Sequence, residues 1–307
     1  MANDCVLYNP LAGNGRGAEE SRRLDTVWPE KKLDYVDLTT IEDVRAYLDA
    51  LPADVSVILA GGDGTINRFI NALGGRDPGR DVYYFATGSG NDFLHDLLDG
   101  DKEGKFSADK PLLLNPYMKD LPVVHVNGMT RYFINGIGYG IDGYCCEVGD
   151  KIRATSDKPV NYTAIAIKGL LFGYHRTTAE VTVDGKTESY KHVWLVPTMN
   201  GRFYGGGMMC APGQDRLNPD RHVTVMVMRG LSKLKTLMVF PSIFKGEHIK
   251  HTEMVTIRTG HRVTVKFDRP TALQIDGETV LGVTEYAVET AAVRKEQPEK
   301  QEAEAVS

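Results

Sequence analysis

The feature that most constrains this fold is an apolar, β-branched run at residues 55–60 that stops at Gly61-Gly62-Asp63-Gly64-Thr65. Residues 68–73, which follow, have helical character. A buried strand that leads through glycines to the start of a helix is typical of a phosphate site. The glycines let an anion approach the backbone, and the amides and the helix dipole favour negative charge. The Asp63 carboxylate adds a potential metal or proton ligand, and the Thr65 hydroxyl adds a donor.

Two similar glycine-rich turns follow other apolar runs. Residues 5–8 lead into a turn at 9–17, and residues 82–86 lead into a turn at 87–92. One such turn is more often a plain connection, but three of them favour a ligand site. Together they offer many donors and few fixed cations, which suits a polyphosphate that carries Mg²⁺. The sequence lacks the Gly-x-x-x-x-Gly-Lys-[Ser/Thr] loop, which excludes an ordinary P-loop NTPase. No Gly-x-Gly-x-x-Gly opens a helix in the first unit, which argues against a Rossmann dinucleotide site.

Strand and helix patterns alternate over the first ~110 residues. Strands are predicted at 5–8, 32–38, 55–60 and 82–86, with helices at 18–27, from 39 to 51, at 68–73 and at 93–98. This alternation predicts a parallel sheet with helices on its faces, whose carboxyl edge is where ligands bind. The three glycine-rich turns all belong to that edge.

The second half of the chain has short apolar runs separated by turn residues. Asn127-Gly128 and Asp184-Gly185 are strong hairpin signals. The pattern predicts an antiparallel sandwich or barrel, interrupted by helices near 162–172 and 231–244. We therefore expect a nucleotide-binding α/β domain at 1–118, a β-sandwich domain at 119–293, and a polar, disordered tail at 294–307. The predicted strands are 123–126, 131–134, 179–183, 193–196, 223–228, 254–257, 262–267 and 272–275.

Composition narrows the class of protein. The 307 residues carry a net charge of −5, which argues against a nucleic-acid partner. The sequence shows no signal peptide, and no apolar run approaches the ~20 residues of a spanning helix. Its four cysteines lack metal spacing, so we expect free thiols in a reducing compartment. We therefore expect a cytoplasmic protein.

A second candidate site is the turn Gln274-Ile275-Asp276-Gly277-Glu278, which follows an apolar run. Asp-Gly favours a hairpin turn, and this is the simpler interpretation. The alternative is that one carboxylate accepts a proton from a hydroxyl nucleophile. The spacing alone leaves both open.

Several short motifs occur in one order along the chain and carry a family resemblance. Taken together, they resemble the diacylglycerol kinase and sphingosine kinase family of lipid kinases, nearest to the soluble bacterial diacylglycerol kinase B and YegS-like members. Matching residues run from Asn9 to Glu278, nearly the whole chain. The motifs are Asn9-Pro10-x-x-Gly13, Gly61-Gly62-Asp63-Gly64-Thr65-x-Asn67, Gly88-Ser89-x-Asn91-Asp92-Phe93, Asn200-Gly201-x-x-Tyr204-Gly205-Gly206-Gly207-Met208, Ala211-Pro212, Gly246-Glu247-His248-Ile249-Lys250-His251 and Asp276-Gly277-Glu278.

The resemblance implies an NAD-kinase/diacylglycerol-kinase-like α/β domain, a β-rich sandwich domain, and ATP-dependent transfer of the γ-phosphate to a lipid hydroxyl. The acceptor it implies is diacylglycerol or a related lipid alcohol; diacylglycerol would give phosphatidic acid in phospholipid biosynthesis. Glu278 would be the general base. Asp63 would act through Mg²⁺ or polarise the nucleophile, although related kinases sometimes give this aspartate the base role. The implied ATP-binding residues are Asn9, Pro10, Gly13, Thr39, Gly61, Gly62, Asp63, Gly64, Thr65, Asn67 and Ser89.

One loop departs from the family pattern. Members with a structural Mg²⁺ often carry Asp-Asp-Gly after the Ala-Pro motif, whereas this chain has Asn218 where a carboxylate is expected. A neutral amide binds Mg²⁺ more weakly, and Arg216 and Arg221 add positive charge nearby. If the metal binds, its neighbours are expected to be Asp215, Asn218 and Asp220.

A soluble lipid kinase must reach its substrate at a bilayer, so we expect transient association with the inner membrane face. Residues 168–176 and 231–240 mix apolar and basic side chains. The simpler interpretation, a core-packed helix with a solvated face, is favoured over membrane contact there. A homodimer is left open.

Two other functions remain open. One is an NAD-kinase-like or phosphofructokinase-like phosphotransferase, because those enzymes share Gly-Gly-Asp-Gly; the 89–93 turn and the late Asp276-Gly277-Glu278 argue against it. The other is a lipid- or nucleotide-binding module without catalysis, against which the presence of both Asp63 and Glu278 argues.

Overall fold

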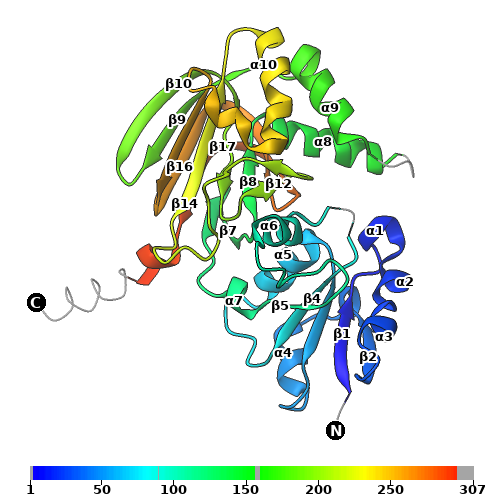
Figure 1. The fold of residues 1–307 in the computed structure, drawn as a ribbon. Helices are drawn as coiled ribbons and strands as arrows, with labels where there is room; N and C mark the ends of the chain where they lie inside the picture. Colours follow the sequence, from blue (N-terminus) through cyan, green and yellow to red (C-terminus); the bar gives the residue numbers. More distant parts are fainter. Residues whose placement is uncertain (1–2, 89, 156–159, 296–307) are drawn as a thin grey trace, which may run out of the picture. The chain divides into compact units, whose positions relative to one another are not determined.

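The computed structural model describes residues 3–88, 90–155 and 160–295. The chain divides between Leu121 and Pro122 into two compact units, each described here by itself (Figure 1). The boundary predicted after residue 118 lies three residues before this division. Residues 291–295 are helical, so the predicted tail does not begin at 294, and its remainder, 296–307, lies outside the described residues.

The N-terminal unit is built on a five-stranded sheet of order β2-β1-β3-β4-β5. The first four strands are parallel, as predicted, and β5 is antiparallel to β4. Its central strand β3 is buried along its whole length, which explains the unbroken apolar run. The strands are β1 (Asp4–Tyr8), β2 (Leu33–Asp37), β3 (Val57–Gly61), β4 (Val82–Ala86) and β5 (Leu112–Leu113).

The helices of this unit begin at other residues than predicted. The segment 18–27 forms two short helices, and the segment from Thr39 holds a 3₁₀ turn before α4, whose N-terminal amide at Ala46 is capped by Asp43. Helix α5 starts at Asp63, so most of the glycine-rich motif is already helix. The helical elements are α1 (Ala12–Gly15), α2 (Gly17–Ser21), α3 (Leu24–Val27), η1 (Leu38–Thr40), α4 (Val44–Ala50), α5 (Asp63–Ala72), α6 (Asp92–Gly100) and α7 (Asn115–Met118).

The C-terminal unit contains a ten-stranded sheet of order β7-β6-β17-β16-β8-β11-β14-β10-β9, with β15 paired to β14. β16 pairs with β8 near its end and with β9 near its start, so part of the sheet closes on itself. A two-stranded sheet, β12 with β13, is separate. The strands are β6 (Val123–Val126), β7 (Met129–Tyr132), β8 (Gly136–Tyr139), β9 (Thr177–Val183), β10 (Lys186–Leu195), β11 (Thr198–Met199), β12 (Phe203–Tyr204), β13 (Met208–Met209), β14 (Val223–Arg229), β15 (Val255–Gly260), β16 (Arg262–Ile275) and β17 (Glu278–Glu289).

Several predictions for this unit were incomplete. The two predicted strands at 262–267 and 272–275 are one strand, β16, whose register shifts between Lys266 and Thr271. Pro270 lies in that irregular stretch, where a residue without an N–H is tolerated. Strands β8 and β17 and helix α8 (Ile141–Arg153) were not predicted. The Asn127-Gly128 and Asp184-Gly185 turns join β6 to β7 and β9 to β10, as predicted.

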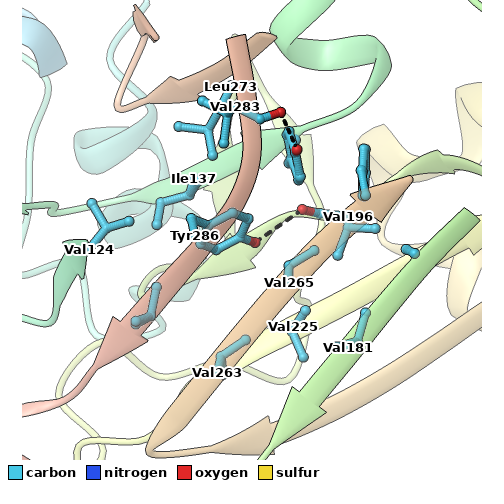
Figure 2. Close-up of a cluster of buried hydrophobic side chains, with 14 of the residues drawn as sticks. Val124, Ile137, Val181, Val196, Val225, Val263, Val265, Leu273, Val283 and Tyr286 are labelled. Carbon is cyan, nitrogen blue, oxygen red and sulfur yellow. Dashed lines mark hydrogen bonds between the residues drawn. The ribbon is translucent and has the colours of Figure 1, made fainter. Parts of the chain in front are cut away.

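Valine side chains from strands far apart in the sequence form the core of this unit. Figure 2 shows Val181, Val225, Val263 and Val265 gathered together, all from strands of the sheet. Two tyrosines at the centre satisfy their hydroxyls on backbone carbonyls: Tyr139 donates to Val283 at 2.6 Å, and Tyr286 to Val196 at 3.4 Å. A buried tyrosine needs such a partner, so the packing is specific as well as apolar.

Helices lie beside this sheet (Figure 1). The predicted helical interruptions are α9 with the π-helical η2, and α10 with the 3₁₀ segment η3. Among the described residues, the structure contains no helix that is long and apolar enough to cross a bilayer. The elements are α9 (Tyr162–Lys168), η2 (Gly169–Gly173), α10 (Lys233–Val239), η3 (Phe240–Lys245) and η4 (Glu247–Lys250).

Candidate active site

The three glycine-rich turns of the N-terminal unit meet at the carboxyl edge of its sheet. The Gly61 carbonyl accepts the Thr87 amide at 2.8 Å. A Cβ at Gly88 would lie 2.5 Å from the Cα of Gly62, and one at Gly13 would lie 2.6 Å from the Thr87 carbonyl oxygen. Larger residues at Gly13 and Gly88 would therefore push the turns apart, and the predicted convergence of the turns is confirmed.

Asn9 joins the first turn to the second. Its amide nitrogen donates to the Thr65 hydroxyl at 3.1 Å, and its side-chain oxygen accepts the Leu11 amide at 3.0 Å. Asn9 therefore shapes its own turn and ties it to the first turn of α5. The structure assigns to Asn9 a clear role in organising this edge.

The glycines of the central motif differ in how closely other atoms pack against them. A Cβ at Gly61 would lie 2.2 Å from the Thr65 hydroxyl, and one at Gly62 would lie 3.2 Å from the Cα of Gly88, so close packing explains both. A Cβ at Gly64 would meet nothing within 4 Å. Among the described residues, no side chain makes a capping hydrogen bond at the Gly62 N-cap of α5. The first turn of α5 is therefore open to an anion that its amides and dipole would attract.

Thr87 is a further candidate ligand-binding residue that the motifs did not predict. The residue is 6% exposed, and its hydroxyl has no hydrogen-bond partner in the described part of the chain. Buried hydroxyls are usually paired, so the Thr87 hydroxyl, at the meeting point of the three turns, is a candidate donor to a bound ligand. The sequence clue was a hydroxyl residue directly at the end of β4, ahead of Gly88.

Asp63 has a structural role that the motif did not reveal. Its two carboxylate oxygens accept the backbone amides of Asp92 at 2.7 Å and Phe93 at 3.1 Å. Through these two bonds Asp63, at the start of α5, caps the N-terminus of α6. Its side chain is largely buried, at 9% exposed. Burial is the main reason that the pKa of Tyr84 is raised, and the negative charge of Asp63 raises it further. Its expected action on Mg²⁺ or on the nucleophile stays a prediction.

The remaining predicted ATP-binding residues are less uniform. The Thr39 hydroxyl, at the end of β2, donates to Asp37 at 2.7 Å, so its proton is already used. Asn67 is buried and accepts the Asn71 amide at 3.2 Å, a contact within α5. Pro10 lies in the first turn between β1 and α1, and Ser89 lies outside the described residues.

The Asp276-Gly277-Glu278 turn of the C-terminal unit joins β16 to β17. Asp276 is 7% exposed, and its carboxylate accepts three backbone amides, from Ile134 at 2.7 Å, Asn135 at 2.9 Å and Gly136 at 2.9 Å. This largely buried carboxylate therefore fixes the turn against the segment that precedes β8.

Glu278 points to a different environment. Its side chain is 44% exposed and forms an ion pair with Arg131 of β7. Behind the turn, Gln274 accepts the Gly277 amide at 2.6 Å and donates to Asp142 at 2.9 Å. The turn thus holds Glu278 at a defined, accessible position. Arg131 was not predicted, because a residue 147 positions away carries no local signal.

The predicted metal residues do not fit a Mg²⁺ site. The Asn218 amide nitrogen donates to the carbonyls of Asp215 at 2.6 Å and His222 at 3.1 Å, and its oxygen accepts the His222 amide at 2.9 Å. A cation needs oxygen ligands, but here a donor nitrogen faces the carbonyls. One carboxylate oxygen of Asp215 accepts the Leu217 amide at 2.9 Å, and Asp220 is exposed.

Comparison with known families agrees with these two units. The diacylglycerol kinase catalytic domain matches residues 4–110, and the YegS C-terminal NAD kinase beta sandwich-like domain matches residues 135–293. The chain belongs to the diacylglycerol kinase/YegS-like lipid kinase family. The recognition and the fold class predicted from the motifs are confirmed.

Individual relatives of the family are distant. A diacylglycerol kinase of Mycobacterium tuberculosis (strain CDC 1551 / Oshkosh) is 25% identical over 260 residues, covering 82% of each chain. A diacylglycerol kinase of Bacillus subtilis (strain 168) is 27% identical over 225 residues, covering 72% of this chain and 70% of that one. These similarities support a lipid kinase, but at this level of identity they do not identify its acceptor lipid.

Solved structures share the fold of the family. The crystal structure of a diacylglycerol kinase from Bacillus anthracis str. Sterne has a TM-score of 0.57 at 17% identity, covering 94% of this chain and 93% of that one. A second structure from that organism reaches a TM-score of 0.64 at 19% identity, covering 94% and 92%. At such identities the likeness concerns the fold alone.

Proposed function

We propose that this protein transfers the γ-phosphate of ATP to the free hydroxyl of a diacylglycerol, producing phosphatidic acid and ADP. The lipid oxygen forms a bond to the γ-phosphorus, the bond from that phosphorus to the β-γ bridging oxygen breaks, and the hydroxyl proton passes to Glu278. The names of the relatives support the acceptor class. Phospholipid biosynthesis at the cytoplasmic membrane face is the corresponding cellular role.

The proposal is supported by the open first turn of α5 at the carboxyl edge of the N-terminal sheet. Gly64 leaves space beside the first turn of α5, and the buried Thr87 hydroxyl lacks a partner among the described residues. In the proposal, the α5 amides and Thr87 donate to phosphate oxygens, while Asn9 holds the turns in place. Arg16 is an exposed cation in the same turn as Asn9. Few fixed charges are present there, so Mg²⁺ is proposed to arrive with ATP as part of the substrate.

Glu278 is proposed as the base because it is the accessible carboxylate of its turn, whereas Asp276 is committed to three amides. Its pairing with Arg131 orients the carboxylate. Proton removal by such a group contributes about 10²–10⁴ in rate, and positioning and charge neutralisation supply the remainder of phosphoryl-transfer catalysis.

The test follows label from γ-labelled ATP into dioleoylglycerol, sphingosine, NAD and fructose 6-phosphate in mixed micelles with Mg²⁺. We expect labelled phosphatidic acid, formed from dioleoylglycerol, and a loss of about 10²–10⁴ in kcat for Glu278→Gln. The matched control is Glu285→Gln, an exposed carboxylate on the same strand. Label on NAD or the sugar phosphate and on no lipid would overturn the proposal. Equal activity of the two variants would remove Glu278 as the base.

A further inference from the structure

Apolar side chains project into solvent along one side of the helical layer of the C-terminal unit. Leu231 is 70% exposed, Leu234 68% and Met238 68%. They are spaced at i, i+3 and i+7, so they form one stripe along α10 and the residue before its cap. The inner face of the helix is different, with Thr236 and Val239 buried. Core packing therefore accounts for one face of α10 and leaves the outer stripe unexplained.

Phe172 extends this stripe from the neighbouring segment η2, and at 81% it is the most exposed of the large apolar side chains described. Two hydrogen-bonded links hold the segments side by side. Lys233 donates from its Nζ to the Leu171 carbonyl at 2.6 Å, and Arg176 donates to the Gly230 carbonyl at 3.0 Å. We call Phe172, Leu231, Leu234 and Met238 the docking surface. Exposed apolar groups on adjoining segments indicate an interaction site.

The two chain segments that carry the docking surface contain cations and no carboxylates, although the whole chain is negative. Residues 221–246 contain no Asp or Glu, and neither do residues 158–179. Within the described parts of these segments the cations are Lys168, Arg176, Arg221, Arg229, Lys233, Lys235 and Lys245. Arg221 lies in the Asn218 loop, and Lys235 is paired with Glu253. In a protein of net charge −5, such a segregation favours a partner that is apolar beneath an anionic layer.

A basic hollow adjoins the stripe. It has a volume of about 520 Å³, and its lining includes Lys191, His192, Arg229 and Leu231. The one carboxylate among its lining residues, Glu253, is paired with Lys235 at 2.8 Å. Lys191 is exposed, so the hollow presents positive charge beside an apolar residue. A lipid phosphate above an acyl layer has the complementary arrangement.

We infer that the docking surface and the basic hollow bind the surface of an anionic phospholipid bilayer, with the four apolar side chains inserted below the headgroups and the cations among the phosphates. This inference rests on the proposed function, because a diacylglycerol kinase must extract its substrate from a membrane. It identifies the face that does so. The sequence favoured a core-packed helix with a solvated face at 231–240; in this proposal α10 packs on its inner side, and its outer side contacts the membrane.

The test measures sedimentation of the full chain with vesicles of phosphatidylcholine alone or mixed with phosphatidylglycerol. We expect binding to the anionic vesicles that weakens as salt rises. Leu234→Ser and Met238→Ser should each weaken it roughly tenfold, and Lys191→Gln about fivefold. The matched control is Met129→Ser, an exposed methionine on β7, at the other end of this unit in Figure 1. It should leave binding unchanged.

A second measurement separates this inference from the proposed function. Activity on a short-chain diacylglycerol in solution should be unchanged in the docking-surface variants, whereas activity on vesicle-borne diacylglycerol should fall with binding. Lack of kinase activity on every diacylglycerol would overturn the proposed function without touching the vesicle result. Equal vesicle binding by Leu234→Ser and wild type would overturn the docking surface. A shift from dimer to monomer in that variant, with vesicle binding unchanged, would assign the surface to a second copy.

Discussion

Asp276 and Glu278 are two residues apart on one turn, yet their carboxylates lie in opposite environments. Asp276 is 7% exposed and accepts three backbone amides, whereas the Glu278 side chain is 44% exposed and pairs with Arg131. Strand alternation alone would place residues two apart on the same face. The separation arises in the turn, because Asp276 has a positive φ of 46° and lies before β17, whereas Glu278 is the first residue of β17. The first carboxylate fixes the turn, and the second is available for chemistry.

Replacing Asp276 should affect stability before it affects catalysis. Asp276→Asn substitutes a donor nitrogen for one acceptor oxygen opposite the amides of residues 134–136, and should lower the free energy of unfolding by about 2–4 kcal/mol. Urea titration followed by circular dichroism measures this. Glu278→Gln serves as the control, because its exposed carboxylate should contribute under ~1 kcal/mol. An Asp276→Asn protein as stable as the Glu278→Gln protein would contradict the structural role.

Thr87 should bind nucleotide without stabilising the fold. Thr87→Val keeps the shape of the side chain and removes a buried hydroxyl that has no partner in the described part of the chain. The free energy of unfolding should therefore stay within ~1 kcal/mol of wild type, while the Kd for ATP rises roughly tenfold. Isothermal titration calorimetry measures the affinity. Thr177→Val, at a buried threonine of the C-terminal unit, should leave ATP affinity as it is. An unchanged Kd in Thr87→Val would show that the hydroxyl does not face the phosphates.

Stability of the loop around Asn218 should not depend on a metal. The thermal midpoint of the wild type should be the same with Mg²⁺ and with a chelator, because the Asn218 amide already bridges the carbonyls of Asp215 and His222. Asn218→Asp places a carboxylate against those oxygens, so its midpoint should fall in chelator and recover with Mg²⁺ or Ca²⁺. Asp220→Asn, at an exposed position, is the control. A wild-type midpoint that falls on chelation would restore the metal site expected from the resemblance.

Acidification should destabilise the C-terminal unit through His248. The residue is fully buried with one ring nitrogen 3.2 Å from the Cys210 carbonyl, and burial lowers its pKa below 6.5. Below pH 6.5 the unfolded chain binds a proton that the folded chain does not, so stability is present above that pH and lost as the pH falls through the folded pKa. The loss is at most about 1.4 kcal/mol per pH unit.

Thermal midpoints of His248→Gln and wild type between pH 7 and pH 5 test this. The wild type should lose more stability than His248→Gln over that range, whereas His251→Gln, at a half-exposed position, should follow the wild type. Parallel curves for all three proteins would exclude His248 as the titrating group.

Local pattern was sufficient for the elements whose residues signal their own conformation. The apolar runs at 55–60 and 82–86 predicted β3 and β4, and Asn127-Gly128 predicted a hairpin. Pattern failed where the conformation depends on distant partners. Strand β16 looked like two strands because its register shifts between Lys266 and Thr271. Helix α8 has apolar residues at helical spacing, but it begins directly after β8 and contains Gly143 and Gly149, which are weak helix formers.

The sequence by itself determined the parallel sheet edge, the order of the motifs and the family, because these depend on residue type and short spacing. Tertiary structure alone decided what individual side chains do there. It commits Asp63 to the amides of α6, leaves the Thr87 hydroxyl without a partner among the described residues, pairs Glu278 with Arg131 and turns the Asn218 nitrogen toward carbonyls. Each of these roles depends on which atoms the fold brings within hydrogen-bond distance. A contact between residues far apart along the chain leaves no trace in local spacing.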